Sequence, residues 1–172
     1  MKKVLGNPAI GTLFRLILAG VLGFAGYIKM IEPNGARDAI MAYRLLPPSV
    51  APFLGYALPA VEIVLAVVLI AGLFVRISGL LSAVLMVLFI IGIASVWIRG
   101  YSIDCGCFGG GGDISADGIA RKYTVEIVRD AVLALMGLWL FRWPHTLVAL
   151  ESNKVGHTFT EDHQDNLDTS DI

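Results

Sequence analysis

The sequence predicts an all-α integral membrane protein, a four-helix bundle with a Cys-x-Cys loop between the third and fourth helices. The first observation is composition: 56% of the 172 residues are hydrophobic, 16% are charged, and the mean hydropathy is +0.76. Ordinary soluble domains carry about 25% charged residues. The second observation is four apolar segments, each near the ~20 residues that a helix needs to cross a bilayer. The third is that both cysteines lie in the long connection after the third segment.

The four apolar segments are expected to be helices, because bilayer hydrocarbon offers no water to unpaired backbone groups. Lys2 and Lys3 precede the first segment, as basic residues do in a signal peptide. The apolar run exceeds the about 7–15 residues of such a peptide, and no clean cleavage site follows, so we expect a retained helix. The predicted helices span about residues 10–30, 50–75, 77–98 and 123–143.

The connections between these helices differ in character. Residues 31–49 contain three prolines and are long enough for a short amphipathic helix, and a tight second connection centres on Arg76. The third connection, residues 99–122, holds both cysteines. We therefore predict one membrane domain over residues 1–150. Residues 151–172, with six acidic residues against one basic residue, are predicted to be a disordered acidic tail.

Basic residues beside the spans bear on orientation. With four spans, each side of the membrane holds six Lys or Arg residues, so their total favours neither orientation. Lys2, Lys3 and Arg15, around the first helix, favour a cytoplasmic N-terminus. We expect a multi-pass plasma- or inner-membrane protein with both termini cytoplasmic and the cysteine loop extracytoplasmic, where thiols can be oxidised. No basic patch interleaved with aromatic residues is present, so nucleic acid is not an expected partner.

Cys105 and Cys107 are separated only by Gly106, the residue best able to adopt the backbone angles of so short a ring. A disulfide between them would close almost no loop, so it would stabilise the fold little. Strained, exposed disulfides are instead the easily reduced kind found at catalytic sites. A Cys-x-Cys pair can instead hold Cu(I). A closed zinc site needs about four ligands. All three histidines lie near or in the C-terminal tail, on the opposite side of the membrane from the cysteines if there are four spans, so they cannot complete such a site. We favour a catalytic redox dithiol and predict no metal site, with copper binding or an inert structural role as alternatives.

Charges beside the cysteines act in opposite directions. Asp104 disfavours a neighbouring thiolate by like-charge repulsion. Arg99, Arg121 and Lys122 flank the loop and can offset that repulsion. The sequence does not decide which effect dominates.

Ionisable residues at membrane depth are costly and usually face partners inside a bundle. Glu62 lies near the middle of the second predicted helix, and Glu126, Arg129 and Asp130 can share one face of the fourth. Pairing of Glu62 with Arg129 or Lys29 would lock the bundle. The functional alternative to such a structural ion pair is a proton path or a quinone-headgroup site at Glu62 and Arg129. Lys29, which closes the first helix, is expected to snorkel to the membrane interface.

Small residues recur at helical spacing in two segments, which lets helix backbones approach closely in lipid. Glycine is also common in membrane helices in general, so both interpretations stay open. The residues are Ala19, Gly20, Gly23 and Gly26 in the first segment, and Ser78, Gly79, Ser82 and Ala83 in the third.

Six short motifs resemble the MauE/DoxX group of redox-associated membrane proteins, and the D-C-G-C-F-G block is the specific one. They are K-M-I-E-P at 29–33, Y-R-L-L-P at 43–47, L-P-A-V-E at 58–62, R-G at 99–100, D-C-G-C-F-G at 104–109 and R-D at 129–130. The resemblance covers about residues 10–142 and implies four membrane helices and redox work for Cys105 and Cys107. The family's name-giving member is linked to methylamine utilisation, where it supports maturation of the disulfide-rich small subunit of methylamine dehydrogenase. The resemblance does not imply a methylamine role for this chain.

The favoured function is a membrane component of extracytoplasmic thiol–disulfide chemistry, and whether the chain is itself an oxidoreductase component stays open. The resemblance implies a thioredoxin-like or disulfide-rich extracytoplasmic partner. Because the chain has only one dithiol, a second redox group must come from a quinone or another protein. The alternatives are a non-enzymatic assembly factor or scaffold and a copper-handling membrane protein.

Overall fold

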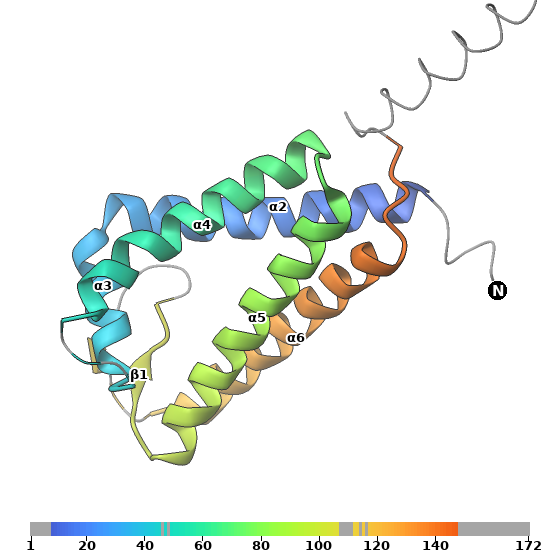
Figure 1. Ribbon diagram of the computed structural model, residues 1–172. Helices are drawn as coiled ribbons and strands as arrows, with labels where there is room; N and C mark the ends of the chain where they lie inside the picture. Colours follow the sequence, from blue (N-terminus) through green and yellow to red (C-terminus); the bar gives the residue numbers. More distant parts are fainter. Residues whose placement is uncertain are drawn as a thin grey trace, which may run out of the picture.

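A computed structural model describes residues 8–45, 47, 49–106, 112–113, 115 and 117–147. Cys107 and the predicted tail at residues 151–172 lie outside these residues. In the described part, a helix of 21 to 24 residues occupies each of the four predicted apolar segments, and a shorter helix follows the first (Figure 1). The elements are α2 (Pro8–Ile31), α3 (Pro33–Ala42), α4 (Ala51–Ala71), α5 (Val75–Ile98), β1 (Ile103–Asp104), β2 (Gly112–Asp113) and α6 (Ile119–Arg142).

Three of the described helices, α2, α4 and α5, are long and apolar enough to cross a membrane. Helix α6 has 24 residues, as many as α2, but carries more charged side chains. Helix α3 confirms the short helix expected in residues 31–49. Strands β1 and β2 pair antiparallel, with Ile103 opposite Asp113. This ladder was not predicted, because two residues per strand leave no periodic pattern in the sequence.

The turn between α4 and α5 lies earlier than predicted. Gly72 takes a left-handed φ of 67° and ends α4, and its N–H donates to the carbonyls of Val68 and Leu69. Glycine is the usual residue at such a helix end because it has no Cβ to clash. Arg76, where the turn was expected, therefore lies in the first turn of α5.

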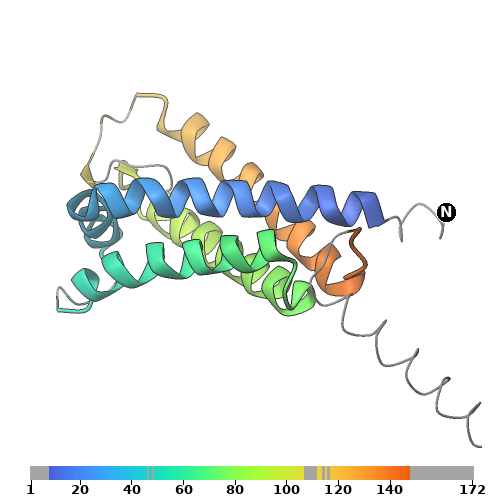
Figure 2. The ribbon, with the colours of Figure 1, turned by 90° about the horizontal axis from the view of Figure 1, so that it is seen from above.

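The long helices pack as two pairs, α2 with α4 and α5 with α6, and the pairs cross one another (Figures 1 and 2). Short helix α3 lies against the first part of α4, near the β1–β2 ladder. One core fills the space where the pairs meet, and Leu18, Leu69 and Leu140 within it are fully buried. A second, smaller core beside β1 contains Cys105.

Glycines permit the closest helix contacts. A Cβ at Gly79 in α5 would lie 2.9 Å from the carbonyl oxygen of Gly137 in α6, and a Cβ at Gly26 would lie 2.8 Å from Ile63. The predicted role of Gly79 and Gly26 in close packing is thus confirmed. Gly20 has no such role, because nothing lies within 4 Å of the position that a Cβ would take there. The role of Gly137 was not predicted from the sequence.

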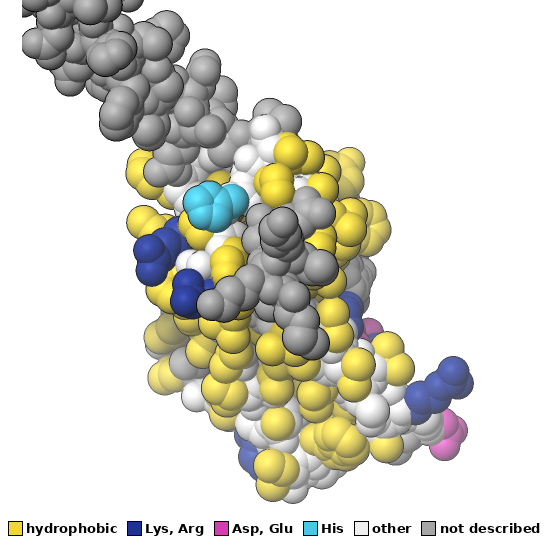
Figure 3. Space-filling view, turned by 90° about the vertical axis from the view of Figure 1, so that its right-hand side faces the viewer, with side chains coloured by type: hydrophobic (Ala, Val, Ile, Leu, Met, Phe, Trp, Pro, Cys, Tyr) yellow, Lys and Arg dark blue, Asp and Glu magenta, His cyan; other side chains and the backbone are white. Residues whose placement is uncertain are grey.

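Large apolar side chains cover the outside of the helices. Phe24 is 57% exposed, Val64 is 60% exposed and Leu135 is 66% exposed. Figure 3 shows hydrophobic side chains over much of one face of the molecule. Soluble monomers rarely expose contiguous apolar patches larger than a few hundred Å². The three apolar helices and this surface therefore indicate a membrane protein whose outer face meets lipid.

Candidate functional site

Cys105 follows β1 at the end of the bundle that α3 covers. Its side chain is 8% exposed and belongs to the small core with Ile93, Val96 and Tyr123. The thiol is therefore packed into the protein at the end of a membrane helix bundle, with only a small exposed fraction. A partner must approach this end of the molecule to reach it.

Two tyrosines hold the backbone around Cys105. The Tyr43 hydroxyl, at the end of α3, donates to the Cys105 carbonyl at 3.2 Å. The fully buried Tyr123 hydroxyl, in α6, accepts from the Ile103 N–H at 2.9 Å and lies 3.0 Å from the Tyr101 carbonyl oxygen. A buried backbone N–H without a partner is costly, so Tyr123 fixes the path of β1. Neither tyrosine was predicted from the sequence as part of the site.

Gly106, the residue between the two cysteines, has a left-handed backbone conformation. Its φ is 68°, in the left-handed region that favours glycine. Its N–H donates to Oδ1 of Asp104 at 3.1 Å. The ring closure expected of Gly106 involves Cys107, which lies beyond the described residues, so that expectation stays a prediction.

Lys122 forms an ion pair with Asp104 beside the cysteine. It lies in the first turn of α6, just before the predicted span at 123–143, and its Nζ is 2.8 Å from Asp104 Oδ2. Partial burial lowers the pKa of Lys122, but the hydrogen bond and charge of Asp104 outweigh it, so the pKa lies above the ordinary 10.5. Arg99 instead donates to the Tyr43 carbonyl at 2.6 Å. Of the predicted offsetting cations, Lys122 is the one bound to Asp104 in the described structure.

Glu126 is a neighbour of Cys105 that was not predicted from the sequence. The Cys105 and Glu126 side chains are hydrogen-bonded. Glu126 is 8% exposed, and its Oε2 has no hydrogen-bond partner among the described residues. A carboxylate in contact with a thiol can accept the proton that leaves when the reactive thiolate forms. The sequence feature that could have pointed to Glu126 is the spacing of Tyr123, Glu126 and Asp130, which places all three on one face of α6.

Four of the charged residues in the bundle interior form two ion pairs. Lys29 Nζ donates to Glu62 at 2.6 Å to Oε1 and 2.9 Å to Oε2, and the two side chains are 6% and 0% exposed. The pairing of Glu62 with Lys29 is thus confirmed, whereas the expectation that Lys29 snorkels outward is wrong. Arg129 binds its neighbour Asp130 at 2.8 Å. Among the described residues, Glu62 pairs with Lys29 and not with Arg129, the alternative partner that was expected.

All four of these charged residues line a gap of only about 10 Å³. A cavity needs roughly 10–15 Å³ to hold one water molecule. Glu62 and Arg129, predicted together as a quinone or proton site, thus share a gap about the size of one water.

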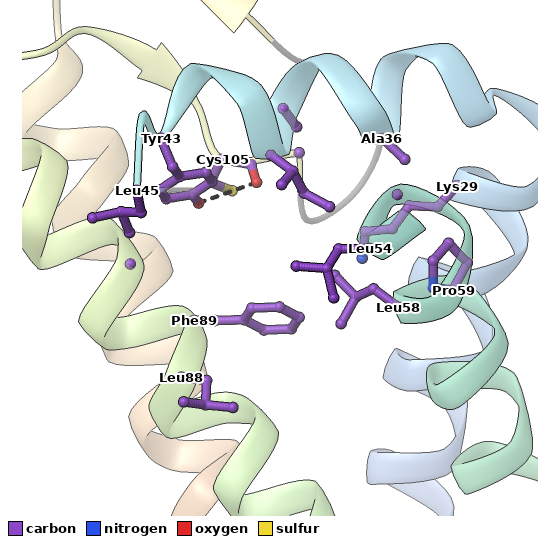
Figure 4. Close-up of a pocket in the computed structure, with 15 residues that line it drawn as sticks. Lys29, Ala36, Tyr43, Leu45, Leu54, Leu58, Pro59, Leu88, Phe89 and Cys105 are labelled. Atoms are coloured by element: carbon purple, nitrogen blue, oxygen red, sulfur yellow. Dashed lines mark hydrogen bonds between the residues drawn. The ribbon is translucent and has the colours of Figure 1, made fainter. Parts of the chain in front are cut away.

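A much larger pocket lies on the other side of Lys29. Its volume is about 360 Å³, and it is lined by residues of α3, α4 and α5, by Lys29 at the end of α2, and by the loop at Cys105. Figure 4 shows Cys105 and Tyr43 at one end, Lys29 and Pro59 at the other, and Phe89 with Leu58 between them. The pocket thus joins the thiol to the buried ammonium.

The family model described as "Methylamine utilisation protein MauE" matches residues 7–142. The chain belongs to the MauE family. The match begins just before α2 and stops at the last residue of α6, so Cys105, Glu126 and the Lys29–Glu62 pair lie inside the family domain of this chain. The broader grouping with DoxX stays a prediction. No curated protein and no solved structure matches the chain.

In this MauE-family protein, the structure divides the predicted site residues between two places. Cys105 lies with Glu126 beside the loop, and Glu62 lies with Lys29 in the bundle interior. The large pocket touches both places through Cys105 and Lys29. Within the described residues, no three His, Cys, Asp or Glu side chains gather where they could hold a metal ion.

Proposed function

We propose that this MauE-family protein is the membrane component of an extracytoplasmic thiol–disulfide exchange system. Cys105 and Cys107 form its redox dithiol, and a thioredoxin-like or disulfide-rich protein is its exchange partner. The observation that carries this proposal is the contact between the Cys105 thiol and the buried Glu126 carboxyl. Thiol–disulfide exchange needs a thiolate, and a buried carboxylate beside a thiol supplies the proton acceptor.

The exchange balances without any further reactant. A partner thiolate attacks the Cys105–Cys107 disulfide, and a mixed disulfide forms while one sulfur of the pair leaves as a thiolate. A second partner thiol then displaces that cysteine. The partner ends as a disulfide and the Cys105–Cys107 pair as a dithiol, having gained two electrons and two protons. Glu126 exchanges the proton of Cys105, and Lys122 balances the charge of Asp104 beside it.

Helix α6, from Tyr123 onward, is proposed to be the fourth membrane span. Its charge excludes it from the three helices selected by composition, yet Glu126 and Asp130 are buried at 8% and 1% exposed. Between positions 125 and 138 its exposed residues are apolar and follow helical spacing: Val125, Val128, Val132, Leu135 and Leu138. A helix with inward charges and an apolar outer face suits a bilayer. Four spans put both termini on one side, proposed to be cytoplasmic, and the Cys105 loop on the other side of the plasma or inner membrane.

The test is to trap the mixed disulfide. In a Cys107→Ser variant, Cys105 should form a stable adduct with the partner protein, visible as a reducible band on a non-reducing gel. The Cys105→Ser/Cys107→Ser double variant is the control and should form none. Alkylation of both cysteines should also change with the redox state of the medium. Full activity of the double variant at normal abundance would instead support a scaffold, and an unchanging alkylation pattern would overturn the redox role.

A further inference from the structure

We infer that the pocket between α3, α4 and α5 binds the ring of an isoprenoid quinone, which accepts the electrons of the Cys105–Cys107 dithiol. This inference rests on the proposed function. The chain has two cysteines in all, so a dithiol reduced by a partner has no second cysteine pair in the same chain to receive its electrons. A lipid-soluble acceptor that reaches Cys105 from the membrane removes that difficulty.

The size and walls of the pocket fit a ring. Its volume of about 360 Å³ lies within the ~300–1,000 Å³ of ordinary small-molecule sites. Its walls are mainly apolar, with Leu54, Leu58 and Phe89 facing its middle (Figure 4). Apolar walls with a few polar groups at defined positions are typical of sites that hold a small ligand.

The pocket also contains a hydrogen-bond donor for a quinone carbonyl, the ammonium of Lys29. The Lys29 ammonium, at one end of the pocket, lies 5.5 Å from the centre of the Phe89 ring. An ammonium has three N–H donors, and its two hydrogen bonds to Glu62 leave one for a ligand. A quinone carbonyl accepts such a bond, whereas the hydrocarbon chain of a lipid cannot. This difference favours a quinone over an acyl chain as the occupant.

The pocket also reaches the lipid-facing surface. Leu45 and Leu88 line it and are 55% and 57% exposed, so its margin is part of the apolar outer face of the helices. An isoprenoid tail can leave between them into hydrocarbon while the ring stays inside. Cys105 lies beside Tyr43, on the same side of the cavity as Leu45 (Figure 4). Ring and thiol therefore share one cavity.

The electron balance is complete. Cys105 and Cys107 lose both S–H protons and two electrons, and a disulfide bond forms between the sulfurs. The quinone gains the two electrons and two protons, and its two carbonyl oxygens become hydroxyls. Glu126, hydrogen-bonded to Cys105, takes the first proton from the thiol. The part of Cys107 in this reaction is inferred only from its position in the sequence, two residues after Cys105.

The test uses the full-length protein in nanodiscs of quinone-free phospholipid, with decyl-ubiquinone as the probe. Wild-type protein should bind it saturably at one site per chain, and the reduced dithiol should lose its alkylation as quinol appears. Leu54→Trp, which fills the pocket, should weaken binding at least tenfold. Phe53→Trp is the matched control, because Phe53 is the adjacent residue, is 72% exposed and is absent from the pocket lining. Ala39→Leu blocks the pocket from α3 as a second variant.

Three outcomes would overturn the quinone site: no saturable binding, equal binding by Leu54→Trp and Phe53→Trp, or equal displacement of the probe by a free fatty acid. Binding without oxidation of the dithiol would overturn its role as electron acceptor. The binding arm is repeated with Cys105→Ser, which should still bind, because the pocket does not depend on the sulfur. Trapping of the partner disulfide without quinone binding would leave the proposed function intact and remove only this inference.

Discussion

Lys29 and Glu62 form a closed ion pair inside the bundle, with Nζ 2.6 Å from Oε1 and 2.9 Å from Oε2. They join the end of α2 to the middle of α4 and are 6% and 0% exposed. Two buried charges offset each other only while both are present, since each alone is left desolvated without a counter-charge. The pair therefore fixes how these two helices meet.

Removing one member of this pair should destabilise the protein strongly. We expect Lys29→Met to lower the free energy of unfolding by about 3–5 kcal/mol, because Glu62 is left as a buried charge. The Lys29→Met/Glu62→Leu double variant replaces both charges by apolar groups and should recover most of that loss. Thermal unfolding in one lipid environment measures both. A double variant less stable than the single one would contradict this account of the pair.

Glu126→Gln should slow exchange at Cys105. Glutamine keeps the shape of the side chain but cannot take the thiol proton, and such proton transfer typically contributes about 10²–10⁴-fold. We expect the rate of disulfide exchange to fall at least about tenfold and to lose the part of its pH profile that depends on this carboxyl. Glu32→Gln, at an exposed carboxylate, is the control and should keep the wild-type profile. Equal profiles for Glu126→Gln and wild type would remove Glu126 from the reaction.

Tyr123→Phe should loosen the segment that leads to Cys105. The variant removes the acceptor of the Ile103 N–H, which is bound at 2.9 Å in a buried position. Leaving that donor unpaired costs about 1–3 kcal/mol. Alkylation of Cys105 should become faster as the segment opens, while Tyr27→Phe, at a tyrosine that is 60% exposed, should change neither quantity. Unaltered alkylation in Tyr123→Phe would show that other contacts position Cys105.

Gly137→Ala should force α5 and α6 apart. The new Cβ would lie 2.6 Å from the Gly79 carbonyl oxygen and 3.1 Å from the Ala83 Cβ, and overpacking of this kind costs about 1–3 kcal/mol. Gly20→Ala is the control, because nothing lies within 4 Å of its Cβ position. Alanine also favours a helix over glycine. The unfolding midpoint should fall in Gly137→Ala and hold or rise in Gly20→Ala, and a reversed order would contradict the packing.

Lys122→Gln should slow alkylation of Cys105 by leaving the Asp104 charge uncompensated. Because the pair is partly exposed, at 37% and 25%, we expect an effect of about two- to fivefold that weakens with added salt. The pKa of Lys122 is raised, so the pair's small stabilising effect is complete below the ordinary pKa of 10.5 and is lost as the pH rises through the raised value. Arg121→Gln, at a neighbouring exposed cation, is the control, and an equal loss in both variants would exclude a specific role for Lys122.

The membrane class and the position of every long helix follow from the amino-acid sequence, because hydrocarbon imposes a length and a composition on each span that can be read locally. The end of α4 at Gly72 was missed, because the apolar run continues past this glycine into α5.

The residues that surround the thiol follow only from the way the helices pack. Glu126 lies 21 positions after Cys105 in the sequence, and Tyr43 lies 62 positions before it. Contacts over such separations depend on how the helices pair and rotate, which no periodic pattern along one segment specifies. The same holds for Lys29, whose long side chain could reach either the interface or the interior. The packing of α2 on α4 directs it to the interior because Glu62 is there to receive it.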